Sequence, residues 1–242
     1  MQTKRGLGLF KEPLVVELVD STQNRVKEPD FPFFVPLVAR AQTAGRGRLG
    51  RRWYSPPGKG LYLSVKFPKG FFPEGDLGCL SLVVGLSVSR TVDAYALSGI
   101  KWPNDVYLRG KKVAGILTEV SGPSVVVGIG VNLNEERFPP ELAPLATSIY
   151  RETQQRVDPD EFLELLLENL SEDLRRFREE GFKPFVEPIN RKLVWKGRRV
   201  LVDNERGRLL GVNSKGWIVL RTCYGKVKEF PAGEVSLRAD RI

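Results

Sequence analysis

The sequence predicts an α+β fold: a mixed, largely antiparallel sheet with flanking helices, followed by a small C-terminal β-barrel. Apolar strand-like runs separated by short turns indicate the sheet, and two stretches with helical spacing of apolar residues indicate the helices. After about residue 190 the chain changes to short strands punctuated by turns, which is typical of a small barrel. With 242 residues and 41% apolar content, the chain can build this core. We divide it into a main domain (residues 1–188) and a barrel (residues 189–242).

The first strand is predicted at residues 13–20 (PLVVELVD), which have β-branched, alternating character. It ends in the polar residues Asp20, Ser21, Thr22 and Gln23, where we expect a turn from strand to helix. The hydroxyl groups there either cap the helix or face a ligand at the strand end, and both can hold at once.

Two further strands are predicted at residues 31–42 and 60–67. The first is largely buried, and in the second Leu61, Leu63 and Val65 alternate with more polar residues. About 18 residues connect them, and connections of this length without structure of their own tend to be functional or mobile lids.

A core helix is predicted at residues 76–97, with Asp76 as its cap and Gly99 as its stop. Residues 100–108 should form a strand that carries the polar cluster KWPND, and residues 111–120 its hairpin partner. A buried strand follows at residues 124–134, where Gly128 and Gly130 leave room for a close approach. A second helix starts at the Asp158 cap and extends to Gly181.

Charge and composition limit the function. The net charge of +9 indicates anionic partners, and the segment from about residue 190 holds 13 basic against 5 acidic residues. A nucleic-acid-binding module is therefore one interpretation of the barrel, although the interleaved aromatic residues of single-strand binders are sparse. The absence of histidine excludes Ser-His-Asp and Cys-His catalysis and His-ligated metals.

The two cysteines indicate the compartment. Cys79 and Cys223 lie far apart in apolar surroundings, which predicts two buried, reduced thiols, with a disulfide as the alternative. The N-terminus has no apolar signal region, and the longest apolar stretch, residues 79–92, is interrupted by Gly85 and Arg90. We expect a cytoplasmic protein without a membrane span.

The loop at residues 40–52 (RAQTAGRGRLGRR) is the segment around which the chain is organised. It holds five arginines, three glycines and no acidic residue. Glycines allow backbone N–H groups to approach a ligand, and Arg46, Arg48 and Arg51 offer forked, permanently charged donors. Such a loop suits phosphate. A solvated surface loop is the alternative. The position of the loop between two predicted strands and the second polar cluster, KWPND, favour a binding loop.

Six motifs in order make the chain resemble a biotin protein ligase over essentially its whole length. They are DSTQN at 20–24, AQTAGRGRLGR at 41–51, KWPNDVYL at 101–108, KKVAGIL at 111–117, GIGVNLN at 128–134, and a barrel ending in PAGEVSLR. The resemblance implies a class II synthetase-like catalytic domain with an SH3-like barrel. It also implies the short form without an N-terminal DNA-binding domain, so no DNA partner is expected, and it suggests a homodimer.

The resemblance implies a two-step reaction without a covalent enzyme intermediate. The carboxylate of biotin attacks the α-phosphate of ATP and gives biotinyl-5′-adenylate and pyrophosphate. The ε-amine of a lysine on a biotin carboxyl carrier protein then takes the biotinyl group. Biotin and ATP are substrates, and ATP brings Mg²⁺ held mostly by phosphates and water, so no dedicated protein metal site is expected.

The resemblance also assigns site residues. Arg48 and Lys112 would cancel the repulsion between the reacting anions, and Asp105 either orients or deprotonates the incoming lysine or pairs structurally with Lys101. The residues implied to bind biotin are Ser21, Thr22, Gln23, Gln42, Arg46, Gly47, Arg48, Lys112 and Gly115. At Gln23 the sequence departs from the asparagine that the family often has. The residues implied to bind ATP are Arg48, Arg51, Trp53, Lys101, Asn104, Lys112 and Asn132, with Trp53 either stacking on adenine or acting as a core residue.

Two alternatives remain at this point. A lipoate protein ligase would share the architecture and the adenylate chemistry, but it is not expected to carry both KWPND and GRGRLGR or this barrel. A nucleic-acid-binding module would bind with steep salt dependence and would not release pyrophosphate from ATP.

Overall fold

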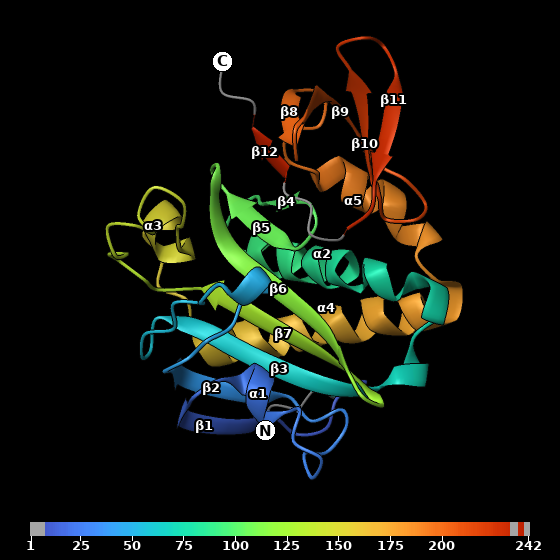
Figure 1. The fold of residues 1–242 in the computed structure, drawn as a ribbon. Coiled ribbons are helices and arrows are strands. Elements are labelled where there is room, and N and C mark those ends of the chain that lie inside the picture. The colour runs from blue at the N-terminus through green and yellow to red at the C-terminus, as the bar shows by residue number, and fades with distance from the viewer. Residues whose placement is uncertain (1–7, 233–236, 240–242) are drawn as a thin grey trace.

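The computed structural model describes residues 8–232 and 237–239 and contains two sheets (Figure 1). The larger sheet has seven strands. In spatial order they are β1 (Leu14–Val19), β2 (Leu37–Gln42), β3 (Gly60–Pro68), β7 (Ser124–Asn132), β6 (Lys111–Ser121), β5 (Asp105–Leu108) and β4 (Gly99–Lys101). β1 and β2 are parallel and every other neighbouring pair is antiparallel, which confirms the predicted mixed, largely antiparallel sheet.

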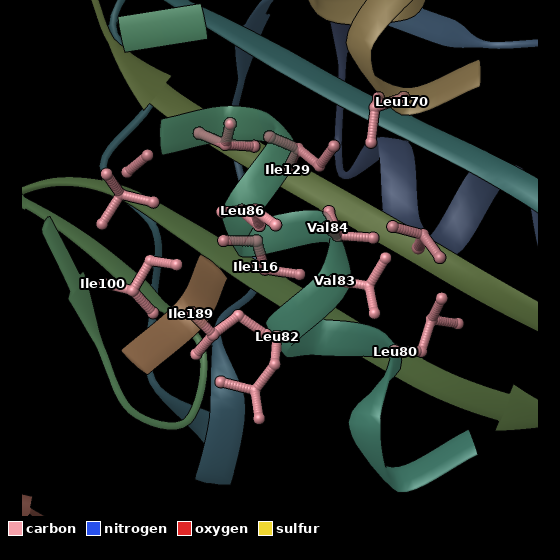
Figure 2. Close-up of a cluster of buried hydrophobic side chains, with 14 of the residues drawn as sticks. Leu80, Leu82, Val83, Val84, Leu86, Ile100, Ile116, Ile129, Leu170 and Ile189 are labelled. Carbon is pink, nitrogen blue, oxygen red and sulfur yellow. The ribbon is translucent and has the colours of Figure 1, made fainter. Parts of the chain in front are cut away.

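Two long helices, α2 (Leu80–Asp93) and α4 (Pro159–Glu180), pack together and cover one face of this sheet (Figure 1). Figure 2 shows the resulting core, in which leucine and valine side chains of α2 meet Ile116 and Ile129 from the sheet and Leu170 from α4. The helical segment Glu74–Asp93 is, within the described residues, long and apolar enough to cross a membrane, but most of it is buried here as a core helix.

The smaller sheet confirms the predicted C-terminal β-barrel region. Its five antiparallel strands are, in spatial order, β11 (Val227–Phe230), β10 (Ile218–Thr222), β9 (Glu205–Val212), β8 (Arg199–Val202) and β12 (Leu237–Ala239). Residues 233–236 of the PAGEVSLR motif lie outside the described residues. The boundary predicted between residues 188 and 189 lies within α5 (Val186–Lys192) and stays a prediction.

The predicted helix cap of α4 is confirmed. The Asp158 carboxylate accepts hydrogen bonds from the backbone N–H groups of Asp160 and Glu161, and the helix ends at Gly181 with φ 69°. The short helices are α1 (Thr22–Arg25), directly after β1, and α3 (Ile149–Thr153), after β7. β3 is buried on both faces because α1 packs on one and α4 on the other, so its alternation does not mark an exposed face.

Three predicted element boundaries are wrong. The strand predicted at 31–42 begins only at Leu37, because Pro32 and Pro36 have no N–H for a ladder and Phe34 has φ 64°. The strand predicted at 100–108 is a hairpin of β4 and β5, folded at residues 102–104.

The helix predicted at 76–97 is the third. Its first turns form a 3₁₀ helix, Glu74–Cys79, and α2 spans only Leu80–Asp93. Asp76 is not its cap, since its carboxylate accepts a hydrogen bond of 2.8 Å from the backbone N–H of Phe182. At the other end Asp93 accepts hydrogen bonds from the backbone N–H and hydroxyl of Ser98, which turns the chain before Gly99.

The cysteine prediction is half right. Both thiols are free, and Cys79 is buried, where burial and then the charge of Asp76 raise its pKa to about 12. Cys223 is exposed, because it lies in the turn between β10 and β11 and not in the core.

Candidate active site

All nine residues predicted to bind biotin line one pocket on the main sheet, of about 50 Å³. They come from the start of α1, the end of β2, the Arg/Gly loop (residues 40–52) and β6. The strand residues Leu63, Ser64, Gly128 and Ile129 form the floor of this first pocket. Fold topology therefore brings together residues that are up to 109 positions apart in the sequence, such as Ser21 and Gly130.

A hydroxyl and amide cluster forms the end of the first pocket. Gln42 accepts hydrogen bonds from the backbone N–H and the hydroxyl of Thr22, at 2.9 and 3.2 Å, and donates to Ser55. The Thr22 hydroxyl also contacts that of Ser64 at 2.8 Å. Ser21 occupies the N-cap position of α1, but its buried hydroxyl caps nothing and has no partner among the described residues. Since buried polar groups are normally paired, this hydroxyl is available to a ligand.

Gln23 links this cluster to Glu119, a residue that the sequence analysis missed. The side chain of Gln23 accepts a hydrogen bond from Ser64 and donates one of 2.9 Å to Glu119 on β6. It lies so close to Gly128 that a Cβ there would meet its oxygen at 2.3 Å. The close approach predicted at Gly128 is therefore made by a side chain of the protein itself.

Glu119 also anchors the Arg/Gly loop. Both carboxylate oxygens accept from Arg46, at 3.1 and 3.3 Å, and Lys27 donates to the same carboxylate at 2.6 Å. Burial acts to raise the pKa of Glu119, but the hydrogen bonds from Lys27 and Gln23 and the charges of Lys27 and Arg46 outweigh it, so the pKa is lowered. The ion pair between Arg46 and Glu119 thus ties the loop to the sheet.

The backbone of the loop is also closed on itself. The N–H of Gly47 donates to the carbonyl of Arg51, and that of Trp53 to the carbonyl of Gly45. A Cβ at Gly45 would lie 2.6 Å from the Trp53 carbonyl oxygen, so only glycine fits there. Residues Arg48–Gly50 form a short 3₁₀ turn at the tip.

All seven residues predicted to bind ATP line a second pocket of about 260 Å³, and Asp105 lines it too. Gly47, Arg48, Trp53, Asn104 and Lys112 line both pockets, so the two are adjacent. The second pocket also has apolar walls that the sequence analysis missed, from Phe138, Leu142 and Leu145 in the segment after β7 and from Leu237 in β12. No helical or strand periodicity marks these residues, because they lie in a turn-rich segment and in a short strand.

Arg48 is held between the two pockets by the KWPND turn. Its guanidinium donates to the side-chain oxygen of Asn104 at 3.1 Å, and the Asn104 amide donates in turn to the carbonyl of Ile116 at 2.8 Å. Burial lowers the pKa of Arg48, and Asp105 partly opposes this; the guanidinium stays charged at any ordinary pH. With both ends of its amide engaged, Asn104 acts on a ligand chiefly by orienting Arg48.

Asp105 pairs with Lys112 and not chiefly with Lys101. Its carboxylate lies 2.6 Å from the Lys112 ammonium and 3.9 Å from that of Lys101. Burial lowers the pKa of Lys101, and its ammonium lies over the rings of Tyr107 and Trp195. The structural pairing expected for Asp105 therefore exists, with a different lysine as the nearer partner.

Trp53 is half-buried and forms a wall shared by both pockets. Its indole rests on the backbone of β6 and β7, where a Cβ would meet the ring at 2.9 Å at Gly115 and at 2.4 Å at Gly130. The Lys112 ammonium lies 5.2 Å from the ring centre. The buried indole N–H has no partner among the described residues. The space over Gly115, expected to receive biotin, is thus taken up by Trp53 and Lys112 in this structure.

No protein metal site of clustered acidic, cysteine or histidine side chains is present within residues 8–232 and 237–239. Asn132, the remaining predicted ATP contact, is buried and donates from its side chain to the carbonyl of Thr147.

The fold and the sequence are those of a protein ligase. Residues 15–134 match the biotin/lipoate A/B protein ligase family. The chain is 36% identical to the biotin--[acetyl-CoA-carboxylase] ligase of Paracoccus denitrificans, over 82% of this chain and 88% of that protein. It is 30% identical to the bifunctional ligase/repressor BirA of Bacillus spizizenii, over 92% of this chain and 72% of that protein.

A solved structure is also similar to this one. The biotin protein ligase from Aquifex aeolicus, in complex with biotin and ATP, is 41% identical and has a TM-score of 0.89, covering 96% of this chain and 100% of that chain. The chain belongs to the biotin protein ligase family. The predicted family, fold class and enzyme class are confirmed.

Proposed function

We propose that this protein activates biotin as biotinyl-5′-adenylate and transfers the biotinyl group to a lysine of a biotin carboxyl carrier protein. One observation carries the proposal: Arg48 and Lys112 lie on the wall shared by the small first pocket and the larger second pocket. The carboxylate of a ligand in the first pocket would meet the phosphate of a ligand in the second pocket. Arg48 and Lys112 would lie beside both groups. The Aquifex aeolicus relative holds biotin and ATP, which supports this assignment of the ligands.

In the first step a carboxylate oxygen of biotin bonds to the α-phosphorus of ATP, and the bond from that phosphorus to the bridging oxygen breaks, so pyrophosphate leaves with the electron pair. Both reactants are anions, and positioned cations lower the barrier most in a site that excludes water. Arg48 is preorganised by Asn104. Lys112 reaches the reacting groups once phosphate competes with Asp105 for its ammonium.

In the second step the ε-amine of the carrier lysine attacks the carbonyl carbon of the adenylate, and the bond to the AMP oxygen breaks. The amine must lose a proton. The carboxylate of Asp105 lines the second pocket, which we assign to ATP. Once Lys112 contacts phosphate, Asp105 can accept that proton or orient the amine.

Selectivity for biotin follows from the hydrogen bonds at the end of the first pocket. The free hydroxyl of Ser21 and the Thr22 hydroxyl suit a ureido ring, which both donates and accepts. Lipoate offers a disulfide there and would leave these groups unpaired, and a site built for hydrogen bonding rejects such analogues strongly.

Pyrophosphate release tests the proposal. We expect release that requires both biotin and ATP, no release with lipoate, and a loss of about 100- to 1,000-fold for Arg48→Ala. Arg178→Ala is the matched control, since Arg178 stacks on Phe71 and lines neither pocket. Pyrophosphate release with lipoate in place of biotin would identify the protein as a lipoate protein ligase. Undiminished release by Arg48→Ala would show that the Arg/Gly loop takes no part in the reaction.

The resemblance supports three finer expectations. We place the enzyme in the cytoplasm, where free thiols such as Cys79 persist. The carrier is expected to present its lysine at the open side of the ATP pocket, and the chain is expected to form a homodimer. Light scattering at increasing protein concentration checks the last point, and a constant monomer mass contradicts it.

A further inference from the structure

A row of arginines crosses the outer face of the C-terminal sheet. In the strand register Arg199 of β8 lies opposite Arg208 of β9, and Arg208 lies opposite Arg221 of β10. All three are exposed, whereas their strand neighbours Val200, Leu209 and Leu220 are buried. Like charges directly opposite each other destabilise a sheet, so this arginine row opposes folding unless an anion lies across it.

Among the described residues, no counter-charge neutralises the row. The guanidinium of Arg208 donates to the carbonyl of Gly197, a neutral group. Within the described residues Arg199 and Arg221 have no ion pair and no side-chain hydrogen bond. A groove of about 600 Å³ runs along the row. Of the residues that the structure describes, its walls also include Arg206, Thr222 and Cys223 but no acidic residue.

A buried threonine lies at the edge of this groove. Thr222 is only 5% exposed and lines the groove, yet its hydroxyl has no hydrogen-bond partner among the described residues. It lies opposite Gly207, where a Cβ would meet the Arg221 carbonyl oxygen at 2.7 Å. That Cβ would also lie 3.3 Å from the Cβ of the buried Leu220, so Gly207 and Thr222 face the core side of the sheet and the arginines themselves provide the charge of the groove.

We propose that this arginine groove is a second anion site, which binds consecutive phosphate groups. Neighbouring strands lie about 4.8 Å apart, so the three arginines span roughly 10 Å, more than one phosphate covers. Guanidinium forks pair with phosphate through two parallel hydrogen bonds. The groove shares no residue with either catalytic pocket, so the site is separate from that of ATP.

The phosphates could belong to a free polyphosphate or to single-stranded nucleic acid, and the surface favours the latter. Tyr224 follows Cys223 directly and is 86% exposed, which places a stacking surface beside the row. Bases stack on such rings while the backbone follows the cations.

Titration of the full chain with inorganic tripolyphosphate and with a short thymidine oligonucleotide tests the site. An Arg48→Ala, Lys112→Ala background removes the two cations that line both catalytic pockets and so weakens phosphate binding there. In that background we expect both probes to bind at about 0.1 M salt, and Arg199→Gln with Arg221→Gln to weaken both about 100-fold, since each lost charge-assisted contact costs roughly tenfold. For the oligonucleotide, the salt slope should fall by roughly 1.4.

A matched pair of substitutions controls for net charge. Arg191→Gln with Lys215→Gln removes the same charge outside the groove and should leave both affinities unchanged. In the otherwise unaltered chain, Arg199→Gln with Arg221→Gln should keep pyrophosphate release and unfold at the same or a higher temperature, because the repulsion is relieved.

Tyr224→Ala distinguishes the two sources of phosphate. A loss of about tenfold for the oligonucleotide alone assigns the site to nucleic acid, and equal retention of both probes assigns it to free polyphosphate. Unchanged affinity in the Arg199, Arg221 double variant would overturn the proposal. So would tighter binding of a glutamate oligopeptide than of either phosphate probe, which would make the groove a surface for an acidic protein.

Discussion

At the scale of single residues, Gly130 determines where Trp53 lies. A Cβ at this position would come within 2.4 Å of the indole, so Gly130→Ala must displace the ring from the wall shared by the two pockets. We expect pyrophosphate release to fall about 100-fold, since a misplacement of about 1 Å costs that much. Steady-state kinetics with biotin and ATP measure the loss.

Gly85→Ala is the matched control. Its Cβ would meet only Ile116, at 3.8 Å, and alanine within a helix is more stable than glycine by about 0.5–1 kcal/mol. Activity should remain, with a higher unfolding temperature. Equal loss in both variants would mean that the position of Trp53 does not matter.

Glu119 makes the closure of the Arg/Gly loop sensitive to acid. Its pKa in the folded protein is lowered below its ordinary value, about 4.3. The stabilisation is therefore complete above the ordinary value and is lost as the pH falls through the lowered one. We expect the hydrogen-exchange protection of residues 43–52, corrected for intrinsic rates, to decline below about pH 4.

Glu119→Gln should remove this dependence and loosen the loop at neutral pH by about 1 kcal/mol, because the ion pairs with Arg46 and Lys27 are partly screened by solvent. Glu136→Gln, which removes a carboxylate paired outside the loop, is the control. Full protection of the loop in Glu119→Gln at neutral pH would contradict the anchoring role.

At the scale of elements, α4 depends on its N-cap. The Asp158 carboxylate satisfies two backbone N–H groups that the helix cannot pair itself. We expect Asp158→Ala to lower the free energy of unfolding by about 1 kcal/mol, measured by urea denaturation. Asp158→Asn keeps an accepting oxygen and should retain most of it. A similar loss in both would point to charge and not to capping.

At the scale of the whole molecule, the KWPND turn connects the active site to the barrel. The buried indole N–H of Trp102 donates to the carbonyl of Gly216, at 3.0 Å, while Trp102 also lines the second pocket. Trp102→Phe leaves that carbonyl without its partner, and we expect a loss of about 1–3 kcal/mol.

The coupling of the two parts should weaken as well. Urea unfolding of Trp102→Phe, followed by far-ultraviolet circular dichroism and by fluorescence, should give midpoints that differ between the two probes, whereas we expect them to coincide in the parent protein. A second connection joins α5 to the barrel, because the Asn190 side chain forms hydrogen bonds with both backbone groups of Val212 in β9. Asn190→Ala tests this connection. Coincident midpoints in both variants would show that packing alone couples the barrel.

The sequence by itself determined the fold class, the cap of α4 and the motifs that carry the site. These features depend on local signals: apolar periodicity, an Asp-Pro helix start, and short patterns of charged and glycine residues. It predicted elements less well at residues 31–36, 76–79 and 94–104, because prolines, a 3₁₀ turn and side-chain hydrogen bonds end elements where periodicity continues.

Only the tertiary structure decided how the site residues meet. In the folded chain Lys112 forms an ion pair with Asp105, Arg46 forms one with Glu119, and Arg48 donates a hydrogen bond to Asn104. The strand register also aligns three arginines across the barrel. Pairings of this kind follow from strand order and register, which join positions tens of residues apart. A charge in a sequence has no partner until the sheet forms, and for that reason these contacts could not be predicted from the chain alone.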